Sequence, residues 1–171
     1  MKALTLTQPW ATLVAIGAKR IETRSWSTWY SGRIAIHAAI GLTPVHGKRG
    51  LRELVASEPF FSALADIAQH SLSKSAVDTI VDALPLGAIV ATAELVDIKH
   101  AETLWPEGKW WRLKGDEMQE WHLDNQERAF GDYGTGRYAW LLADVRPLAE
   151  PIPAKGALGL WEWTPPEGWT P

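Results

Sequence analysis

The alternation of apolar and polar residues predicts a chain that begins with a strand and a short helix. Residues 2–7 alternate with the period of two that is typical of a half-buried strand. Pro9 then suits the first turn of a helix, where its missing N–H costs nothing, and Gly17 suits the position that ends this helix. Five further segments have strand character: residues 21–26, 33–38, 87–98, 138–148 and 159–163.

Residues 44–84 have a different pattern, in which apolar side chains recur at helical spacing. Two apolar runs, around Leu51 and around Phe60, are separated by Pro59, and residues 76–84 predict a third short helix. Short strands with helices at two junctions predict an α+β fold. We interpret it as a small β-barrel with flanking helices and a helical insertion at residues 44–84.

The length of 171 residues predicts one domain, which we assign to residues 1–163, followed by an extended tail at residues 164–171. Residues 101–136 are rich in tryptophan, glycine and charge and show no clean periodicity. We interpret them as a lid-like excursion from that domain rather than as a second domain.

Composition excludes several classes of protein. The chain has no cysteine, which excludes a disulfide framework and a thiolate zinc site. No apolar run approaches the roughly 18 residues of a membrane span, and the N-terminus lacks the apolar core of a signal peptide. No pair among the five histidines has the spacing of a metal motif. We therefore expect a soluble, cytoplasmic protein with no membrane partner, no bound metal and no cofactor.

Charge is distributed unevenly along the chain. Residues 1–52 carry eight Lys or Arg and one acid, whereas the remaining residues carry nine bases and nineteen acids. This asymmetry indicates a surface for an anionic ligand in the first third, although a dipole that closes on itself would give the same counts. The chain also has eleven tryptophans, of which most are expected in the core and some as platforms for a flat ligand.

The densest polar cluster lies between Gly17 and Trp26. If the strand begins near residue 21, then Glu22, Arg24 and Trp26 project from one face. Lys19 lies at the corner before this strand, within reach of Glu22. Such a set could hold an anion through Arg24, stack a base on Trp26 and transfer a proton through Glu22 or Lys19. A surface ladder of paired charges on an edge strand would give the same spacing.

Three motifs stand in this part of the chain: Gln8-Pro9-Trp10-Ala11, Gly17-x-Lys19-x-x-Glu22-x-Arg24-Ser25-Trp26 and Gly32-Arg33-x-x-x-His37-Ala38. Together they resemble the ASCH domain, a family named for homology to the activating signal cointegrator within the PUA-like superfamily of small β-barrels. A weaker likeness continues through Leu86-Gly87 to Gly156-Ala-Leu-Gly-Leu-Trp161.

This resemblance implies a barrel with a cleft that engages RNA or nucleosides. Some small relatives hydrolyse the acetyl amide of acetylated cytidine with a Lys, a Thr and a distal Glu, and others are similar to single-strand-specific ribonucleases. By position, the family Lys corresponds to Lys19 and the family Arg to Arg24. Glu22 occupies the Thr position, which is a departure from the pattern.

The departure leaves three interpretations of Glu22 open. A nearby carboxylate stabilises the ammonium of Lys19 and works against its use as a base. Glu22 could be the base itself, while Lys19 and Arg24 hold an oxyanion or phosphate. With Arg24 and a histidine (His37 or His100), Glu22 could also cleave RNA without a metal. It could finally act only as an acceptor that reads a base edge.

Further candidates lie along the chain. Glu94 is the natural candidate for a distal catalytic carboxylate, and an outward-facing strand acid is its ordinary alternative. Arg33 and His37 share a strand face and are expected to line the same cleft as Arg24. Lys48 and Arg49 begin a helix, where the dipole disfavours positive charge unless an anion binds, and they form a second candidate phosphate contact.

We therefore predict a protein that binds RNA or a modified nucleoside, with single-stranded nucleic acid as a further candidate partner. Lys19, Glu22 and Glu94 are the candidate catalytic residues for hydrolysis of acetylated cytidine or single-stranded RNA. The alternative is a non-catalytic adaptor that binds another protein through a tryptophan-rich face.

Overall fold

A computed structural model describes residues 1–68, 75–101, 109–114 and 117–169. The chain forms two compact units. The first unit contains Met1–Ala18, Arg33–Ala93 and Val145–Pro171, and the second contains Lys19–Gly32 and Glu94–Asp144.

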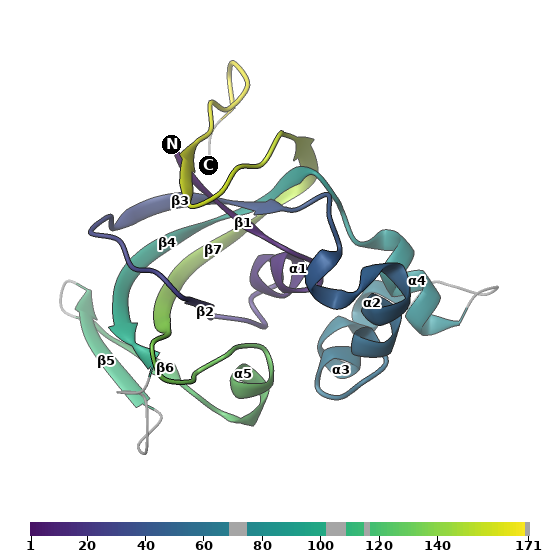
Figure 1. Cartoon of the computed structure of the whole chain (residues 1–171). Coiled ribbons are helices and arrows are strands. Elements are labelled where there is room, and N and C mark those ends of the chain that lie inside the picture. The colour runs from purple at the N-terminus through teal and green to yellow at the C-terminus, as the bar shows by residue number, and fades with distance from the viewer. Residues whose placement is uncertain (69–74, 102–108, 115–116, 170–171) are drawn as a thin grey trace. The chain divides into compact units, whose positions relative to one another are not determined.

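The strands of the first unit begin with β1 (Lys2–Leu6), which lies between β3 (Gly32–Ala38) and β8 (Leu160–Glu162). The pairing of β1 with β3 is parallel, and that of β1 with β8 is antiparallel. Figure 1 labels two long strands, β4 (Ala88–His100) and β7 (Tyr138–Pro153). Both strands contribute residues to both units. With β2 (Ile21–Arg24), these strands form one sheet in the order β2-β7-β4-β3-β1-β8.

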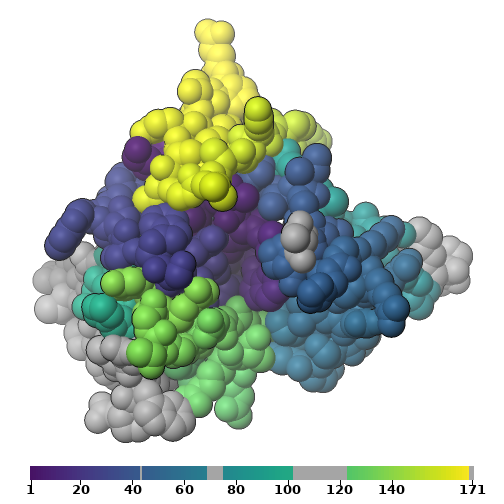
Figure 2. All heavy atoms as spheres, viewed as in Figure 1, coloured from purple at the N-terminus to yellow at the C-terminus, as the bar shows by residue number. Residues whose placement is uncertain are grey.

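The helices of the first unit are mostly contained in the segment between β3 and β4. The elements of this unit are α1 (Trp10–Ala15), η1 (Thr43–Val45), α2 (Gly47–Val55), α3 (Phe60–Leu64), η2 (Ala65–Ala68) and α4 (Ala76–Ala83). Ser75 caps α4 because its hydroxyl accepts a hydrogen bond from the backbone N–H of Asp78. Figure 2 shows residues 44–68, in blue, as one continuous mass of side chains.

The core of the first unit follows from the alternation on β1 and β3. Leu4, Ile34 and Ile36 are fully buried, as are Leu13 of α1 and Leu64 of α3. A second, smaller cluster contains Ala3, Ala35, Ile89 and Trp163, against which Trp161 and Trp169 pack. Both faces of β1 and β3 therefore pack against apolar side chains.

The second unit is built around β2, which pairs antiparallel with the start of β7, so that Glu22 lies opposite Trp140 and Arg24 opposite Tyr138. It also contains the antiparallel pair β5 (Lys109–Lys114) and β6 (Glu117–His122) and the short helix α5 (Asn125–Ala129). Its core is formed by Ile21, Ala101, Leu123, Ala139, Leu141 and Ala143.

The predicted α+β class with a helical insertion is confirmed, but several boundaries differ. β2 ends at Arg24, so Trp26 lies beyond the strand expected over residues 21–26. β7 continues to Pro153, past the predicted end at residue 148. The excursion at residues 101–136 contains β5, β6 and α5; its residues 102–108 and 115–116 lie outside the described residues, and its lid-like role stays a prediction.

Candidate functional site

Lys19 occupies the corner between α1 and β2. Gly17 has a φ of 78° and its N–H bonds the carbonyl of Val14, which ends α1 as predicted. The Lys19 side chain is 0% exposed, and its ammonium donates a hydrogen bond to the carbonyl oxygen of Ile21. Its Nζ lies 3.7 Å from Oε2 of Glu22, which confirms the expected proximity of these two residues.

A second carboxylate, that of Glu127, reaches the same ammonium. Lys19 Nζ lies 3.6 Å from Glu127 Oε1. The Glu127 carboxylate also accepts hydrogen bonds from the backbone N–H groups of Arg20 (2.8 Å) and Ile21 (3.2 Å). Burial raises the pKa of Glu127, while Lys19 and the two N–H groups lower it. Glu127 thereby fastens α5 to the start of β2.

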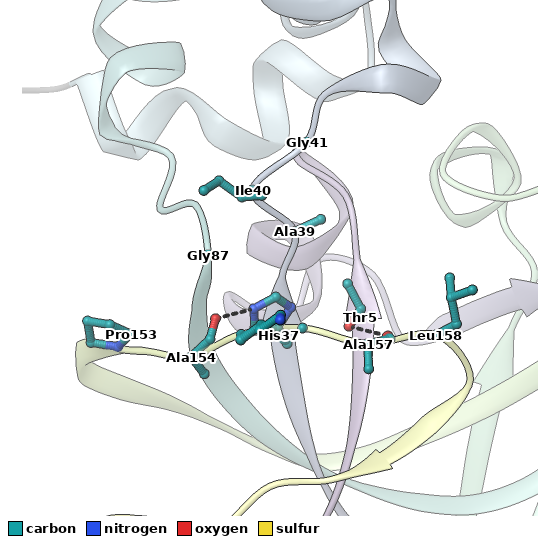
Figure 3. A pocket seen from close by; sticks show the side chains of 12 residues that line it. Thr5, His37, Ala39, Ile40, Gly41, Gly87, Pro153, Ala154, Ala157 and Leu158 are labelled. Carbon is teal, nitrogen blue, oxygen red and sulfur yellow. Dashed lines mark hydrogen bonds between the residues drawn. The ribbon is translucent and has the colours of Figure 1, made fainter.

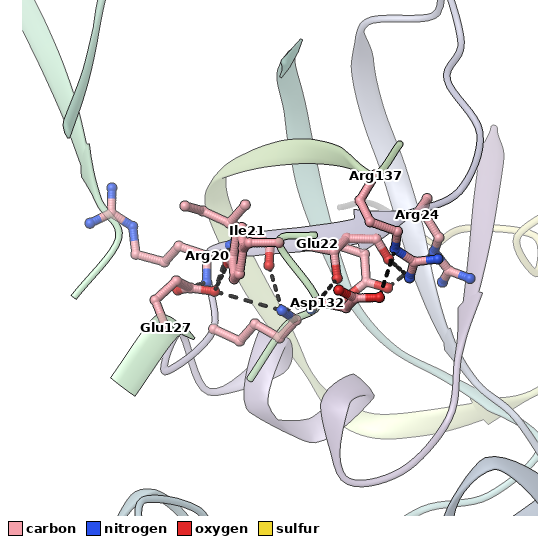
Figure 4. A network of polar contacts seen from close by, with 10 residues as sticks. Arg20, Ile21, Glu22, Arg24, Glu127, Asp132 and Arg137 are labelled. Carbon is pink, nitrogen blue, oxygen red and sulfur yellow. Dashed lines mark hydrogen bonds and ion pairs between the residues drawn. The ribbon is translucent and has the colours of Figure 1, made fainter. Parts of the chain in front are cut away.

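Glu22 links the buried ammonium to a more exposed guanidinium. Glu22 Oε1 lies 3.0 Å from Arg24 Nε, and Figure 4 shows the sequence of contacts from Glu127 to Arg24. The side chain of Glu22 is 11% exposed and that of Arg24 is 24% exposed. Two cations therefore face two carboxylates, and the polar network opens to solvent at Arg24.

The turn before β7 is hydrogen-bonded to β2. The backbone N–H of Asp132 donates to Thr23 Oγ1 (3.0 Å), and Arg137 Nε lies 3.2 Å from Asp132 Oδ2 (Figure 4). The Tyr133 hydroxyl lies 3.5 Å from Glu127 Oε1, and burial, followed by the charges of Glu127 and Glu22, raises its pKa. Residues 131–136 form a turn that positions Arg137 beside β2.

A pocket of about 560 Å³ lies beyond the end of β2 in the second unit. It is lined by Ser27, Thr28, Trp29, Tyr30, Ser31, Val96, Asp97, Ile98, His100 and Tyr138. The Trp29 side chain is fully exposed, and the His100 and Tyr138 rings lie 4.8 Å apart. Because Tyr138 lies opposite Arg24 in the β2–β7 pair, the two side chains leave the same face of the sheet. The pocket thus adjoins the exposed end of the network.

Glu94 and Trp26 also lie in the second unit. Glu94 is half-buried on β4, and strand alternation places it on the same face as Val96 and Ile98 of the pocket. Its Oε1 lies 4.0 Å from the place that a Cβ would occupy at Gly32. Trp26 packs edge-on against Trp140 at 4.6 Å, and its carbonyl accepts a hydrogen bond from the Trp140 indole.

The other predicted binding residues belong to the first unit. His37 is 2% exposed, its Nε2 lies 3.0 Å from the carbonyl oxygen of Ala154, and burial lowers its pKa. Arg33 is half-buried near the start of β3. Lys48 and Arg49 are exposed and form ion pairs with Asp82 (2.6 Å) and Glu53 (2.9 Å), respectively.

Sequence reasoning missed the contribution of Glu127, Tyr133 and Arg137. The pattern Asp124-x-x-Glu127 is a helix-start signal, and the Asp124 side chain does accept a hydrogen bond from the Glu127 N–H (2.7 Å). Nothing in that pattern indicates a partner more than a hundred residues away. Within the described residues, no group of three His, Asp or Glu side chains could hold a metal ion. None of the helices described is long and apolar enough to cross a membrane.

Comparisons with known proteins agree with the motifs. A family model described as the ASCH domain matches residues 4–151. No curated protein matches the chain. Solved structures that match include the ASCH protein of Zymomonas mobilis, with 18% identity, coverage of 89% of this chain and 72% of that chain, and a TM-score of 0.43. A mutant of the same protein also matches, with 17% identity, coverage of 89% of this chain and 74% of that chain, and a TM-score of 0.42. The family match covers most of the sequence, and the chain therefore belongs to the ASCH domain family.

Proposed function

We propose that the second unit binds RNA or a nucleoside, with an unpaired base in the pocket of residues 27–31 and 96–100 and, in the case of RNA, a phosphate at Arg24. The observation that carries this proposal is the position of an aromatic-lined pocket beside a partly exposed guanidinium. Such a pair of features favours a flat ring and an anion, which are two of the three parts of a nucleotide.

The pocket has the size and lining of a ligand site. Its volume of about 560 Å³ lies within the range of roughly 300–1,000 Å³ that is usual for small-molecule sites. Trp29 is fully exposed at its edge, so its indole is accessible to a flat ring. The hydroxyl groups of Ser27 and Ser31 supply donors and acceptors for a base edge.

The buried part of the network has a positioning role in this proposal. Lys19 is fully buried and bonded to the Ile21 carbonyl, so its ammonium does not contact a ligand. It holds the Glu22 carboxylate, which in turn fixes the direction of the Arg24 guanidinium. A guanidinium fixed before binding loses less conformational entropy when it meets a phosphate.

The hydrolase hypothesis stays a prediction, with a revised assignment of roles. Lys19 is fully buried and its ammonium donates a hydrogen bond to the Ile21 carbonyl, which argues against Lys19 as a proton acceptor for a bound ligand. Glu22 is the better candidate for that role, with Glu94 as the second carboxylate. Incubation of the wild type and Glu22→Gln with acetylated cytidine and with labelled single-stranded RNA tests it. Product from the wild type alone supports hydrolysis, and product from neither protein leaves recognition as the function.

The adaptor alternative receives less support from the tryptophans whose side chains are described. Trp10 packs on Phe60, and Trp163 packs on Trp169. Trp161 packs on His37. Of the described tryptophan side chains, Trp29 is the one that is exposed. A continuous tryptophan face for a peptide therefore has no basis in these residues.

Fluorescence anisotropy with a labelled single-stranded RNA tests the proposal. We expect Arg24→Ala to weaken binding at least several-fold and to reduce the dependence of log affinity on log salt by about one. Arg49→Ala is the matched control, because that guanidinium is exposed in the first unit and pairs with Glu53. Equal affinities and equal salt slopes for the wild type and Arg24→Ala would contradict the assignment of a phosphate to Arg24.

A further inference from the structure

A second arginine lies beside Arg24 at the edge of β2 that faces away from β7. The Arg20 carbonyl accepts a hydrogen bond from the N–H of Leu142 on β7, so the alternation along β2 turns the Thr23 carbonyl toward the opposite edge. Arg137 Nη2 lies 3.5 Å from this carbonyl oxygen. Thr23 precedes Arg24, and Figure 4 shows the Arg24 and Arg137 side chains next to each other at one end of the polar network. The two guanidinium groups are therefore neighbours within the second unit.

Each of these guanidinium groups is held by a carboxylate and still reaches solvent. Arg24 Nε lies 3.0 Å from Glu22 Oε1, and Arg137 Nε lies 3.2 Å from Asp132 Oδ2. The side chain of Arg24 is 24% exposed and that of Arg137 is 30% exposed. A guanidinium has five N–H donors, so one carboxylate oxygen does not exhaust its capacity. The pair thus presents two oriented cations to a ligand.

The acid that faces Arg137 is more easily replaced than the acid that faces Arg24. The Asp132 side chain is 66% exposed, whereas that of Glu22 is 11% exposed. An exposed ion pair contributes little to stability, so an anionic ligand can compete with Asp132 for Arg137 at small cost. Glu22 is also held by Lys19, which keeps the direction of Arg24 fixed during such an exchange.

The larger pocket of the first unit, of about 800 Å³, offers no comparable pair of cations (Figure 3). Most of its lining is alanine, glycine and aliphatic side chains, and exposed Lys155 is the single Lys or Arg among the described residues that line it. One ammonium is a point charge on a flexible stem, whereas two guanidinium groups form a directed set of donors. The second unit therefore has the better site for an anion of high charge.

We propose that Arg24 and Arg137 together bind a phosphomonoester, so that the ligand is a nucleoside monophosphate or an RNA that ends in a phosphate. This inference rests on the function proposed above and specifies its ligand. A phosphomonoester carries about −1.5 to −2 charge at pH 7 and three terminal oxygens, whereas a phosphodiester within RNA carries about one charge. Two guanidinium groups match the former. Tyr138 follows Arg137 and lies opposite Arg24, so the base pocket that Tyr138 lines is within reach of the same nucleotide.

Isothermal titration calorimetry with the full chain tests this inference on ligands that differ by one phosphate. The first set is cytidine and adenosine, each with its 3′- and 5′-monophosphates. The second set is a short RNA of mixed sequence with hydroxyl groups at both ends or with a phosphate at either end. We expect the better phosphorylated form in a set to bind about ten-fold more tightly than the hydroxyl form. A gain in the RNA set identifies an RNA end as the source, and a gain confined to the first set identifies a free nucleotide.

The outcomes separate this inference from the function on which it rests. Saturable binding with equal affinities for the phosphorylated and hydroxyl forms of both sets would overturn the phosphomonoester and leave the proposed function standing. The absence of saturable binding for every ligand would overturn both.

Arg137→Gln measures the share of the second guanidinium. We expect the affinity for phosphorylated ligands to fall by about five- to ten-fold and that for the hydroxyl forms to stay within about two-fold, because only the terminal phosphate contacts Arg137. Arg49→Gln is the matched control, since Arg49 Nε also pairs with a carboxylate, that of Glu53 at 2.9 Å, in the first unit. It should change neither affinity. Equal losses for phosphorylated and hydroxyl forms in Arg137→Gln would reduce Arg137 to a support of the fold and would overturn the inference.

Asp132→Asn tests the same contact in the opposite direction. The amide keeps an oxygen for the Gly134 N–H, which donates to Asp132 Oδ1 (3.0 Å), but removes the charge that competes for Arg137. We expect the affinity for phosphorylated ligands to rise about two- to three-fold and that for the hydroxyl forms to stay unchanged. A damaged fold cannot produce such a gain. An unchanged or lower affinity for the phosphorylated ligands would contradict the placement of the phosphate at Arg137.

Discussion

Two groups of basic residues in this protein have similar compositions but different surroundings. In the second unit, Lys19 is 0% exposed and lies between two buried carboxylates. In the first unit, Lys48 and Arg49 are exposed, Arg49 at 91%, and each pairs with one exposed acid. Both groups are candidate anion contacts by sequence. Because Lys19 is buried, its polar network is part of the fold, whereas the exposed ion pairs of Lys48 and Arg49 contribute little to stability.

Burial also determines whether a basic side chain positions other residues or contacts a ligand itself. A buried ammonium cannot meet a ligand, but it determines where Glu22 and, through Glu22, Arg24 are held. Lys48 and Arg49 are exposed, and each is held by an ion pair with an exposed acid, which fixes the direction of the side chain less firmly than a buried network does. The second unit is thus the better candidate for specific recognition, although the first group has more accessible charge.

The largest effect is expected from removal of the buried ammonium. Lys19→Met removes the buried cation that both Glu22 and Glu127 face, and we expect the free energy of unfolding to fall by about 3–5 kcal/mol. Urea denaturation measures this change. Lys48→Met is the matched control in the exposed group, with an expected loss below about 1 kcal/mol. Similar losses for the two variants would break the comparison.

Glu127→Gln is expected to have the next largest effect. The substitution removes the charge that faces Lys19 and weakens the bonds to the N–H groups of Arg20 and Ile21, so we expect a loss of about 2 kcal/mol. Compared with the wild type, amide hydrogen exchange in the variant should become faster in α5 and stay unchanged in α2. Glu53→Gln, which alters the exposed pair with Arg49, should leave stability within about 0.5 kcal/mol of the wild type.

Trp29→Ala distinguishes the pocket from the rest of the surface. Loss of a stacked base contact corresponds to about 1–3 kcal/mol, so we expect RNA affinity to fall by about five-fold or more. Because Trp29 is fully exposed, the free energy of unfolding should not change. Leu158→Ala removes a similarly exposed apolar side chain from the first unit and should leave RNA affinity unchanged. Equal effects of the two variants would remove Trp29 from the site.

The smallest effect concerns the pH dependence of stability. The pKa of His37 is lowered from 6.5 by burial, so below about pH 6.5 the unfolded chain binds a proton that the folded chain does not. Stability from this residue is therefore present above pH 6.5 and is lost as the pH falls through the folded pKa, by at most about 1.4 kcal/mol per pH unit. Denaturation of the wild type and of His37→Gln between pH 7 and pH 5 measures this. A steeper loss in the variant would contradict the sign.

The local part of the site could be predicted from the sequence. Lys19, Glu22 and Arg24 are close in sequence, so the alternation of a short strand is enough to bring them together. The partners of Lys19 and Thr23 in residues 127–137 could not be predicted, because only the pairing of β2 with β7 brings that segment to the strand. Local patterns contain no information on such distant pairings.

The sequence did not predict β5 or the part of β7 after residue 148, and each omission has a physical explanation. Trp110 and Trp111 are adjacent in β5, which hides the alternation that marks a strand. β7 contains Pro147, Pro151 and Pro153, which ordinarily indicate the end of a strand. The pairing of β2 with β7 covers only residues 138–141, so these prolines interrupt no hydrogen bond to β2.

The central claim is that RNA binds at the pocket beside Arg24, and the side-chain N–H signals of the tryptophans test it most directly. Among the described tryptophan side chains, Trp29 alone is exposed, whereas Trp140 is fully buried in the same unit. On titration with a short single-stranded RNA, we predict that the indole signal of Trp29 moves most and that of Trp140 stays close to its free position. Saturable RNA binding that leaves the Trp29 signal unchanged would contradict the account.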